Sequence, residues 1–214
     1  SDLTGIFAHR AAAVQVNYLG YPGTMGAPFI DYLIGDPVVT PREACAWYDE
    51  KIVNLPHCYQ VNDRQRKISE RVFSRSELGL PEDAFVFCSF NSCHKILPGW
   101  FDHWMRLLRE VPGSVLWLLR DNDVTSAHLQ KEAAARGVDP ARLLFAGRMP
   151  LAEHLARQRA ADLFLDTFPY NAHTTASDAL WAGLPVLTCA GRSFASRVAA
   201  SLLHSIGLRS EEHT

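Results

Sequence analysis

The sequence predicts an α/β protein built on a doubly wound parallel sheet. Five short apolar runs recur between residues 84 and 189, and segments with helical spacing separate them. The runs are continuously apolar rather than alternating, which is typical of strands buried on both faces. Strands that alternate with helices favour a parallel sheet with right-handed crossovers. Ligands of such sheets bind at the carboxyl ends of the strands, so the loops that follow the strands are the candidate binding segments.

Each expected element of this regular part follows from its local pattern. The helix over 100–111 places Trp100, Trp104 and Leu107 on one stripe, and the next helix is expected to begin at a Thr125 cap and to end before Gly137. The expected strands cover residues 84–90, 115–119, 143–146, 163–165 and 185–189, and the expected helices cover 100–111, 125–136, 151–161, 177–182 and 196–206.

The first 80 residues are less regular. Residues 14–19 and 29–34 are expected to be strands, and 40–48 a helix with proline at its first position. Residues 60–70 are polar and expected to be exposed, and the proline-flanked stretch 76–81 suggests a domain boundary. Too few elements precede that boundary for a closed domain, so we expect part of a larger domain there.

Composition narrows the classes of function. The formal charge of the 214 residues is −2, so no basic field indicates a nucleic-acid partner. No apolar run approaches the roughly 20 residues of a membrane span. The five cysteines include no CxxC pair, which fits reduced thiols and a cytoplasmic protein, and Cys93 and His94 have no spacing typical of a metal site.

The strongest functional signal is the segment 166–178, which joins an apolar strand to a helix. Free N–H groups and the helix dipole favour a phosphate at such a place. Thr174 and Thr175 add hydroxyl donors, His173 adds an imidazole, and Asp178 adds a carboxylate suited to a ribose. The segment therefore predicts a site for a nucleoside diphosphate. The alternative is structural, because Thr175 with Asp178 also fits a capping box.

Two further strand-end loops carry candidate ligand groups. Lys95 ends the loop 90–95 and can act as a point charge on a phosphate, although a plain surface lysine is the alternative. His154 and Arg157 share one helix face, where an imidazole can stack on a base and a guanidinium can bind its carbonyl edge. The alternative there is a solvated face.

A tight turn, Gly20-Tyr21-Pro22-Gly23-Thr24, follows the first expected strand. Glycine permits close backbone approach to a ligand. The turn lacks the spacing of a dinucleotide fingerprint, and the chain has no Walker lysine pattern.

Together these segments resemble the cytosolic glycosyltransferases that include protein O-GlcNAc transferase and its bacterial homologues. The matching stretches span nearly all of residues 14–208. They are Val16-Asn17-Tyr18-Leu19-Gly20-Tyr21-Pro22-Gly23-Thr24, Ser89-Phe90-Asn91 with Lys95, Leu165-Asp166-Thr167 through His173-Thr174-Thr175, Asp178-Ala179-Leu180-Trp181-Ala182-Gly183 and Ala195-Ser196-Arg197-Val198-Ala199.

The resemblance implies a GT-B fold, with the donor between two Rossmann-like domains. It implies an inverting, metal-independent transfer of GlcNAc from UDP-GlcNAc to Ser or Thr of an acceptor protein, with no cofactor. It also implies roles for individual residues: Lys95 as the catalytic lysine that neutralises the diphosphate, His173, Thr174 and Thr175 at phosphate, Asp178 at ribose, His154 and Arg157 at uracil, and Gly20 and Pro22 near the sugar.

On this resemblance, residues 1–78 are part of an N-terminal catalytic domain on the acceptor and sugar side. Residues 79–214 are a Rossmann-like nucleotide-binding domain without its C-terminal tail, so the chain is expected to be an incomplete catalytic region. Two alternatives stay open. Thr167-Phe168-Pro169-Tyr170 is shared with protein O-fucosyltransferases that use GDP-fucose, although His173 and Trp181-Ala182-Gly183 favour the GlcNAc branch. The other is a nucleotide-binding or interaction module without turnover.

Overall fold

The computed structural model describes residues 4–208 and divides the chain into two compact units. The first unit comprises residues 1–62 with 190–214, and the second comprises residues 63–189. The predicted domain ranges, 1–78 and 79–214, differ from these units in two respects. The second unit begins at residue 63 rather than 79, and residues from 190 onward belong to the first unit. The polar stretch after residue 62 packs with the second unit, and the last helix packs with the first.

The second unit contains a five-stranded sheet in which every pairing is parallel, as the sequence predicts. Its strand order is β6-β5-β4-β7-β8. The strands are β4 (Val86–Ser89), β5 (Val115–Leu119), β6 (Leu143–Ala146), β7 (Leu163–Leu165) and β8 (Val186–Leu187). The chain order reverses between β4 and β7, so the carboxyl ends of these two strands flank the switch point where such sheets bind ligands.

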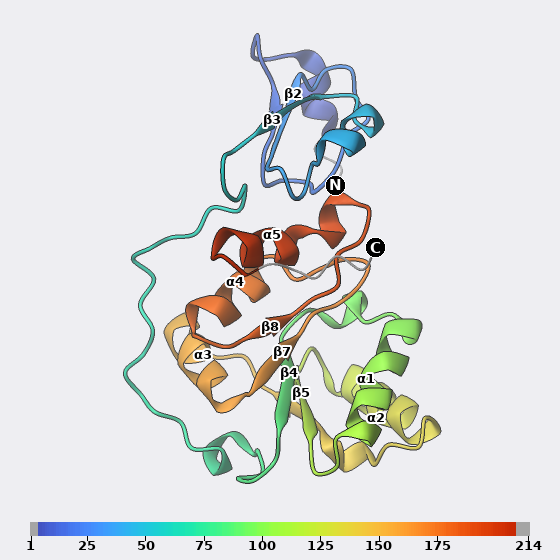
Figure 1. Ribbon diagram of the computed structural model, residues 1–214, viewed down its shortest axis with the longest axis vertical. Helices are drawn as coiled ribbons and strands as arrows, with labels where there is room; N and C mark the ends of the chain where they lie inside the picture. The colour runs from blue at the N-terminus through green and yellow to red at the C-terminus, as the bar shows by residue number, and fades with distance from the viewer. Residues whose placement is uncertain (1–3, 209–214) are drawn as a thin grey trace. The chain divides into compact units, whose positions relative to one another are not determined.

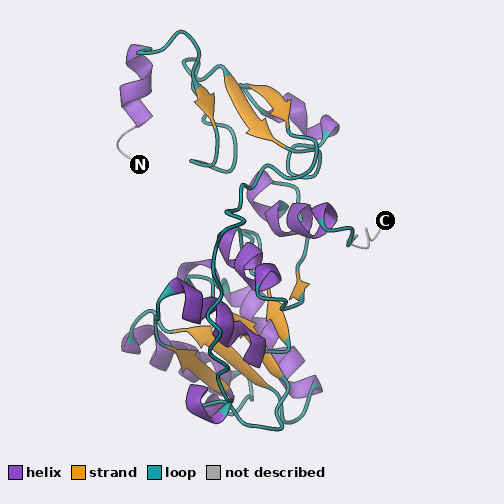
Figure 2. Cartoon of the chain, turned by 90° about the vertical axis from the view of Figure 1, so that its left-hand side faces the viewer, coloured by secondary structure: helices purple, strands orange, loops and turns teal. Residues whose placement is uncertain are grey.

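Helices cover both faces of this sheet, as Figures 1 and 2 show, with α1 and α2 on one face and α3 and α4 on the other. They are α1 (Pro98–Glu110), α2 (Asp123–Ala135), α3 (Leu151–Arg157) and α4 (Thr174–Trp181). This unit also contains four short 3-10 helices: η3 (Ser76–Leu78) and η4 (Cys93–Lys95) before α1, η5 (Pro140–Arg142) before β6 and η6 (Gln158–Ala160) after α3.

Two predicted helix starts were wrong. The cap of α2 is Asn122, whose side chain accepts a hydrogen bond from the Thr125 amide at 2.8 Å. Helix α4 begins at Thr174, three residues before the predicted start at 177. Its end matches the pattern, because Gly183 follows it with φ +85°, a conformation that favours glycine.

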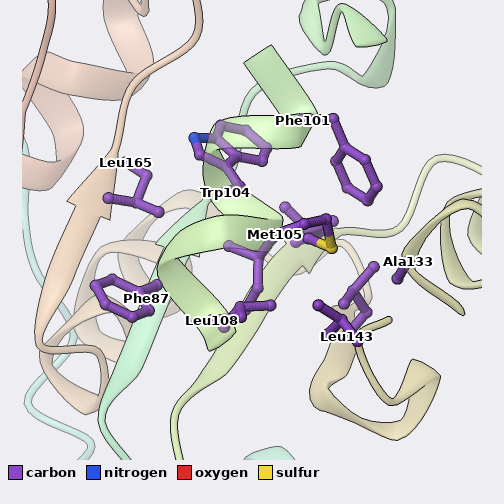
Figure 3. Close-up of a cluster of buried hydrophobic side chains, with 11 residues drawn as sticks. Phe87, Phe101, Trp104, Met105, Leu108, Ala133, Leu143 and Leu165 are labelled. Carbon is purple, nitrogen blue, oxygen red and sulfur yellow. The ribbon is translucent and has the colours of Figure 1, made fainter. Parts of the chain in front are cut away.

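The core of the second unit lies between α1 and the sheet (Figure 3). The buried face of α1 carries Phe101, Trp104, Met105 and Leu108. These side chains pack with residues of the strands and of α2, among them Phe87, Leu116, Leu118, Ala133, Leu143 and Leu165. This packing fixes the strands whose ends carry the candidate site.

The first unit contains a three-stranded parallel sheet in the order β1-β2-β3. Its strands are β1 (Val16–Asn17), β2 (Tyr32–Gly35) and β3 (Lys51–Asn54), and its helical segments are η1 (Thr4–His9), η2 (Arg42–Trp47), η7 (Phe194–Ser196) and α5 (Val198–Ser205). Strand β3 has no counterpart among the predicted elements, because its side chains are largely exposed and polar at both ends. Residues predicted as an α-helix over 40–48 form a 3-10 helix instead.

Helix α5 completes the core of this unit. Phe194 and Val198 pack with Leu33, Val39 and Tyr59. The Ser201 hydroxyl donates to the buried Asp36 carboxylate at 2.6 Å, and the Tyr59 amide donates to the same oxygen at 2.8 Å. Residues separated by more than a hundred positions therefore share one core.

Within residues 4–208, no helix is both long and apolar enough to cross a membrane.

We predict that Leu108→Ala lowers the free energy of unfolding of the second unit by about 2–5 kcal/mol, the usual cost of a cavity at a buried leucine. Leu108 is only 1% exposed. Urea unfolding followed by tryptophan fluorescence measures the change. Val124→Ala is the control because Val124 is 81% exposed, and an equal effect of both variants would contradict the packing described here.

Candidate functional site

The loop between β7 and α4 is held by one buried carboxylate. Asp166 Oδ1 accepts hydrogen bonds from the amides of Thr167 at 2.7 Å and Ala172 at 2.6 Å. Its Oδ2 accepts from the Thr188 hydroxyl at 2.6 Å. These bonds fold the loop back on its own first residue and fix the position at which α4 begins.

Burial sets the charge state of this carboxyl group. It raises the pKa of Asp166 to about 6, while the three hydrogen-bond donors and Lys95 act in the opposite direction. The Asp166 backbone carbonyl also accepts a hydrogen bond from the Trp100 indole at 2.8 Å, which ties the loop to α1.

Lys95 lies at the end of the loop that follows β4, and it is not a plain surface lysine. Its Nζ donates to the Asn171 carbonyl at 2.9 Å and lies 4.2 Å from the centroid of the Tyr170 ring. Burial lowers the pKa of Lys95 to about 8, opposed by the charge of Asp166. The structure thus brings the predicted lysine against the predicted phosphate loop.

The start of α4 presents the other predicted phosphate ligands. His173 is the residue before the helix, its ring stacks on Tyr170 at a centroid distance of 4.9 Å, and Thr174 is exposed at the first helical position. The Thr175 hydroxyl donates to Asn91 Oδ1 at 2.6 Å, which joins the loops after β4 and β7. The capping-box alternative is wrong, because the helix begins before Thr175 and no side chain caps it.

His154 and Arg157 form a buried pair on α3. Arg157 is 2% exposed and donates to His154 Nδ1 from Nε at 3.1 Å and to the Gly147 carbonyl at 2.6 Å. Since a guanidinium only donates, His154 Nδ1 is the acceptor and its proton is on Nε2. Burial, assisted by the Arg157 charge, lowers the pKa of His154 to about 4, so the ring is neutral at physiological pH.

The two predicted uracil ligands have different surroundings in the structure: Arg157 is buried, whereas His154 is only partly buried. His154 is half-buried and packs against the Phe90 ring at a centroid distance of 5.1 Å, with one N–H group not used by Arg157. The Arg157 guanidinium lies over the rings of Phe90 and Trp117 and orients His154.

Asp178, the predicted ribose ligand, lies in the second turn of α4 and is 6% exposed. Its Oδ1 forms an ion pair with Nη1 of Arg66, a residue from the stretch predicted to be exposed. Burial raises the pKa of Asp178, and the Arg66 charge opposes that rise.

Gly20 and Pro22 belong to the first unit, in the turn after β1. The Asn17 side chain is buried and donates to the carbonyls of Tyr21 at 3.1 Å and Gly23 at 3.0 Å, so it closes the turn. Gly20, Tyr21 and Thr24 line an open, mainly apolar cleft of about 920 Å³ within this unit.

Within the second unit, the structure therefore gathers the half-buried Lys95, the uncapped start of α4, the neutral imidazole of His154 and the buried carboxylate of Asp178. A cation beside helix-start donors suits a diphosphate. The imidazole suits a base, and the carboxylate suits the hydroxyls of a ribose. Among residues 4–208, no three His, Cys, Asp or Glu side chains cluster as a metal site would require.

Sequence reasoning missed four contributors to this arrangement. Tyr170 and Asn171 were given no role from the sequence, although both contact Lys95 in the structure. Arg66 had no pattern that could have found it, because a lone arginine in a polar stretch is ordinarily exposed. Asp166 carried a usable signal, since an acid that ends a buried strand must find donors.

The fold is that of the GT-B glycosyltransferases. A mutant of Thermobaculum terrenum O-GlcNAc transferase superimposes with a TM-score of 0.82 at 33% identity, over 95% of this chain and 38% of that one. Anabaena HepE, solved with UDP and glucose, shares the fold with a TM-score of 0.53 at 18% identity, over 78% of this chain and 46% of that one.

The chain belongs to glycosyl transferase family 41, whose model matches residues 3–72 and 67–211. The probable UDP-N-acetylglucosamine–peptide N-acetylglucosaminyltransferase SEC of Arabidopsis thaliana is 43% identical over 208 residues, which are 95% of this chain and 21% of that protein. The corresponding Caenorhabditis elegans enzyme is 28% identical, over 95% of this chain and 27% of its own length. The chain thus spans about a fifth to a quarter of these relatives.

We predict that Asp166→Ala lowers the free energy of unfolding by about 3 kcal/mol or more, because it leaves three donors without their acceptor. Asp166→Asn should cost far less, since the amide oxygen can still accept from the Thr167 and Ala172 amides. Urea unfolding of both variants measures this, with the exposed Asp83→Asn as control.

Comparison of wild type with Asp166→Asn also tests how stability depends on pH. The pKa of Asp166 is raised above its ordinary value of 3.8 to about 6 in the folded chain, so the folded state binds this proton more tightly than the unfolded state. The stabilisation is complete below the unfolded pKa and is lost as pH rises through about 6. Wild type should therefore gain stability relative to Asp166→Asn between pH 7 and pH 4; a constant difference would show that Asp166 has an ordinary pKa.

A second pH prediction concerns Lys95. Because the pKa of Lys95 is about 8, its positive charge is present below that pH and lost above it. The affinity for a nucleoside diphosphate should therefore fall above pH 8, by up to about tenfold per pH unit. Lys95→Ala should lower affinity at pH 7 by about 1.5–3 kcal/mol and abolish the fall. Calorimetric titration with UDP at several pH values measures both, and Lys131→Ala on the exposed surface of α2 is the control.

Proposed function

We propose that this chain is the nucleotide-binding part of a protein O-GlcNAc transferase, which transfers GlcNAc from UDP-GlcNAc to Ser or Thr hydroxyls of acceptor proteins. The observation that carries the proposal is the position of Lys95 against the loop and helix start that follow β7. The relatives named for this activity and the membership of family 41 support it.

The diphosphate end of the donor lies at the start of α4 in this proposal. His173, Thr174 and Thr175 supply donors there, and the helix dipole favours the negative charge. Lys95 exchanges its bond to the Asn171 carbonyl for one to a phosphate oxygen. Its partial burial strengthens this attraction, because less water screens the charge.

The transfer is proposed to be an inverting, single displacement. The acceptor oxygen bonds to the anomeric carbon while the bond from that carbon to the β-phosphate oxygen breaks, and the hydroxyl proton passes to water. The electron pair leaves on UDP, so negative charge grows on the diphosphate. A fixed lysine and fixed helix-start donors stabilise that charge, which is the part that a metal ion plays in other glycosyltransferases. We therefore propose a metal-independent reaction without a cofactor.

The nucleoside end is assigned to α3 and α4. His154 offers its Nε2–H to a uracil carbonyl, and its neutral state is fixed by burial and by Arg157. Asp178 accepts from ribose hydroxyls with the lone pairs that Arg66 does not use. Gly20 and Pro22 are proposed to lie near the sugar, since glycine and proline leave the turn after β1 compact.

The partners follow from this reaction: a nucleotide-sugar donor and a Ser- or Thr-bearing acceptor protein, with neither nucleic acid nor membrane. A GDP-fucose-dependent O-fucosyltransferase is the second candidate, favoured by Thr167-Phe168-Pro169-Tyr170. A binding module without turnover is the third, and a cytoplasmic location is proposed for all three.

Calorimetric titration of the 214-residue chain with UDP, UDP-GlcNAc, GDP and GDP-fucose tests the proposal. We predict that UDP binds at least about tenfold more tightly than GDP, because the site reads a pyrimidine edge with a single donor; tenfold corresponds to about 1.4 kcal/mol. Equal affinities would favour the fucosyl candidate, and the absence of UDP binding would refute the nucleotide site itself.

A further inference from the structure

The stretch that opens the second unit runs across the two helices that carry the nucleoside-binding candidates. The Ser69 amide donates to the Ala152 carbonyl in α3 at 3.0 Å. The Trp181 indole at the end of α4 donates to the Arg66 carbonyl at 3.3 Å. We call residues 63–69 the strap. Both anchoring bonds use its backbone, so they do not depend on the Arg66 side chain.

The Arg66 side chain lies on Asp178. Its Nη1 pairs with Asp178 Oδ1, and the guanidinium carbon is 5.7 Å from the centroid of the Trp181 ring. Only 13% of the Arg66 side chain and 9% of the Asp178 side chain are exposed. The Nε and Nη2 atoms of Arg66 are buried and have no hydrogen-bond partner in the structure, so the guanidinium forms its one hydrogen-bonded ion pair with Asp178.

A buried arginine with two donor atoms unused is costly to keep unless its one contact matters. Asp178 gains from it in two ways. The guanidinium holds Oδ1 of Asp178 in place. Because the carboxylate is planar, this also fixes the direction in which Oδ2 can accept hydrogen bonds. It also offsets burial, which would otherwise favour a protonated carboxyl that accepts poorly from a diol.

We infer that Arg66 is the positioning residue of the ribose subsite, and that it acts through Asp178 by holding its carboxylate oriented toward the ribose hydroxyls. The inference rests on the proposed function, because it assumes that Asp178 binds ribose. It adds a residue of the strap to a site otherwise formed by strand-end loops and helices.

The experiment measures discrimination between UDP and 2′,3′-dideoxy-UDP by calorimetric titration of the 214-residue chain. Their affinity ratio reports the ribose hydroxyls alone, because both nucleotides carry the same base and the same diphosphate. We expect a ratio of at least about tenfold for wild type, the scale of a hydrogen bond to a charged group. In Arg66→Leu the ratio should fall toward one, because Asp178 loses the partner that holds its carboxylate in place.

A double-mutant cycle separates this role from a merely structural one. If Arg66 acts through Asp178, Arg66→Leu combined with Asp178→Asn should show the same ratio as Asp178→Asn alone. Arg66→Lys should restore much of the ratio because it restores the charge. Arg71→Leu is the matched control, since Arg71 is an exposed arginine close by in the chain that pairs with Glu77. Thermal unfolding of each variant shows that it is folded.

The outcomes are distinct. A wild-type ratio in Arg66→Leu, together with its loss in Asp178→Asn, overturns the inference and leaves the proposed function intact. An additive cycle also overturns it. A wild-type ratio in Asp178→Asn refutes the ribose assignment, and the inference with it.

Discussion

The buried carboxylate of Asp166 is the constraint on which the candidate site depends. Its two oxygens accept from the amides at both ends of the loop that follows β7 and from the Thr188 hydroxyl beside β8. The loop it holds supplies the carbonyl that receives Lys95 and the ring that lies under its ammonium group. Without this anchor, the start of α4 and the lysine would have no fixed relation to each other.

Burial sets the charge of two of the candidate ligand groups, Lys95 and His154. It brings the pKa of Lys95 down to about 8 and that of His154 down to about 4. The first remains a cation at neutral pH and can meet a diphosphate, whereas the second is neutral and can offer a single N–H. Desolvation therefore leaves Lys95 charged at neutral pH, whereas it keeps His154 neutral and able to donate one directional hydrogen bond.

The sequence predicted the second unit well because its strands are buried on both faces and leave an unbroken apolar record. All five strands appear within a few residues of their expected ranges. Strand β3 was not predicted, because its side chains are largely exposed and show no apolar pattern. The start of α2 was misplaced, because Asn122 is as good a cap as Thr125 and comes earlier in the chain.

The candidate site was predictable only where type and place agreed. Lys95, His173 and Thr174 lie in, or at the end of, the loops that follow β4 and β7, so topology gathers them near the switch point. The burial of Arg157 and the pairing of Arg66 with Asp178 depend on tertiary packing. The spacing of three residues places Arg157 beside His154 but does not reveal that Arg157 is buried, and no spacing rule indicates that Arg66 pairs with Asp178.

The packing of α5 with the first unit has a consequence for the order of events during synthesis. Leu33, Val39 and Tyr59 emerge from the ribosome early, yet their partners Phe194 and Val198 are added more than a hundred residues later. The second unit is one continuous stretch, 63–189, whose local contacts are complete before those partners exist. Domains usually mature from the N-terminus onward as the chain grows. Here the stretch 63–189 can mature first, while Leu33, Val39 and Tyr59 have no core partners on the chain until Phe194 and Val198 have been added.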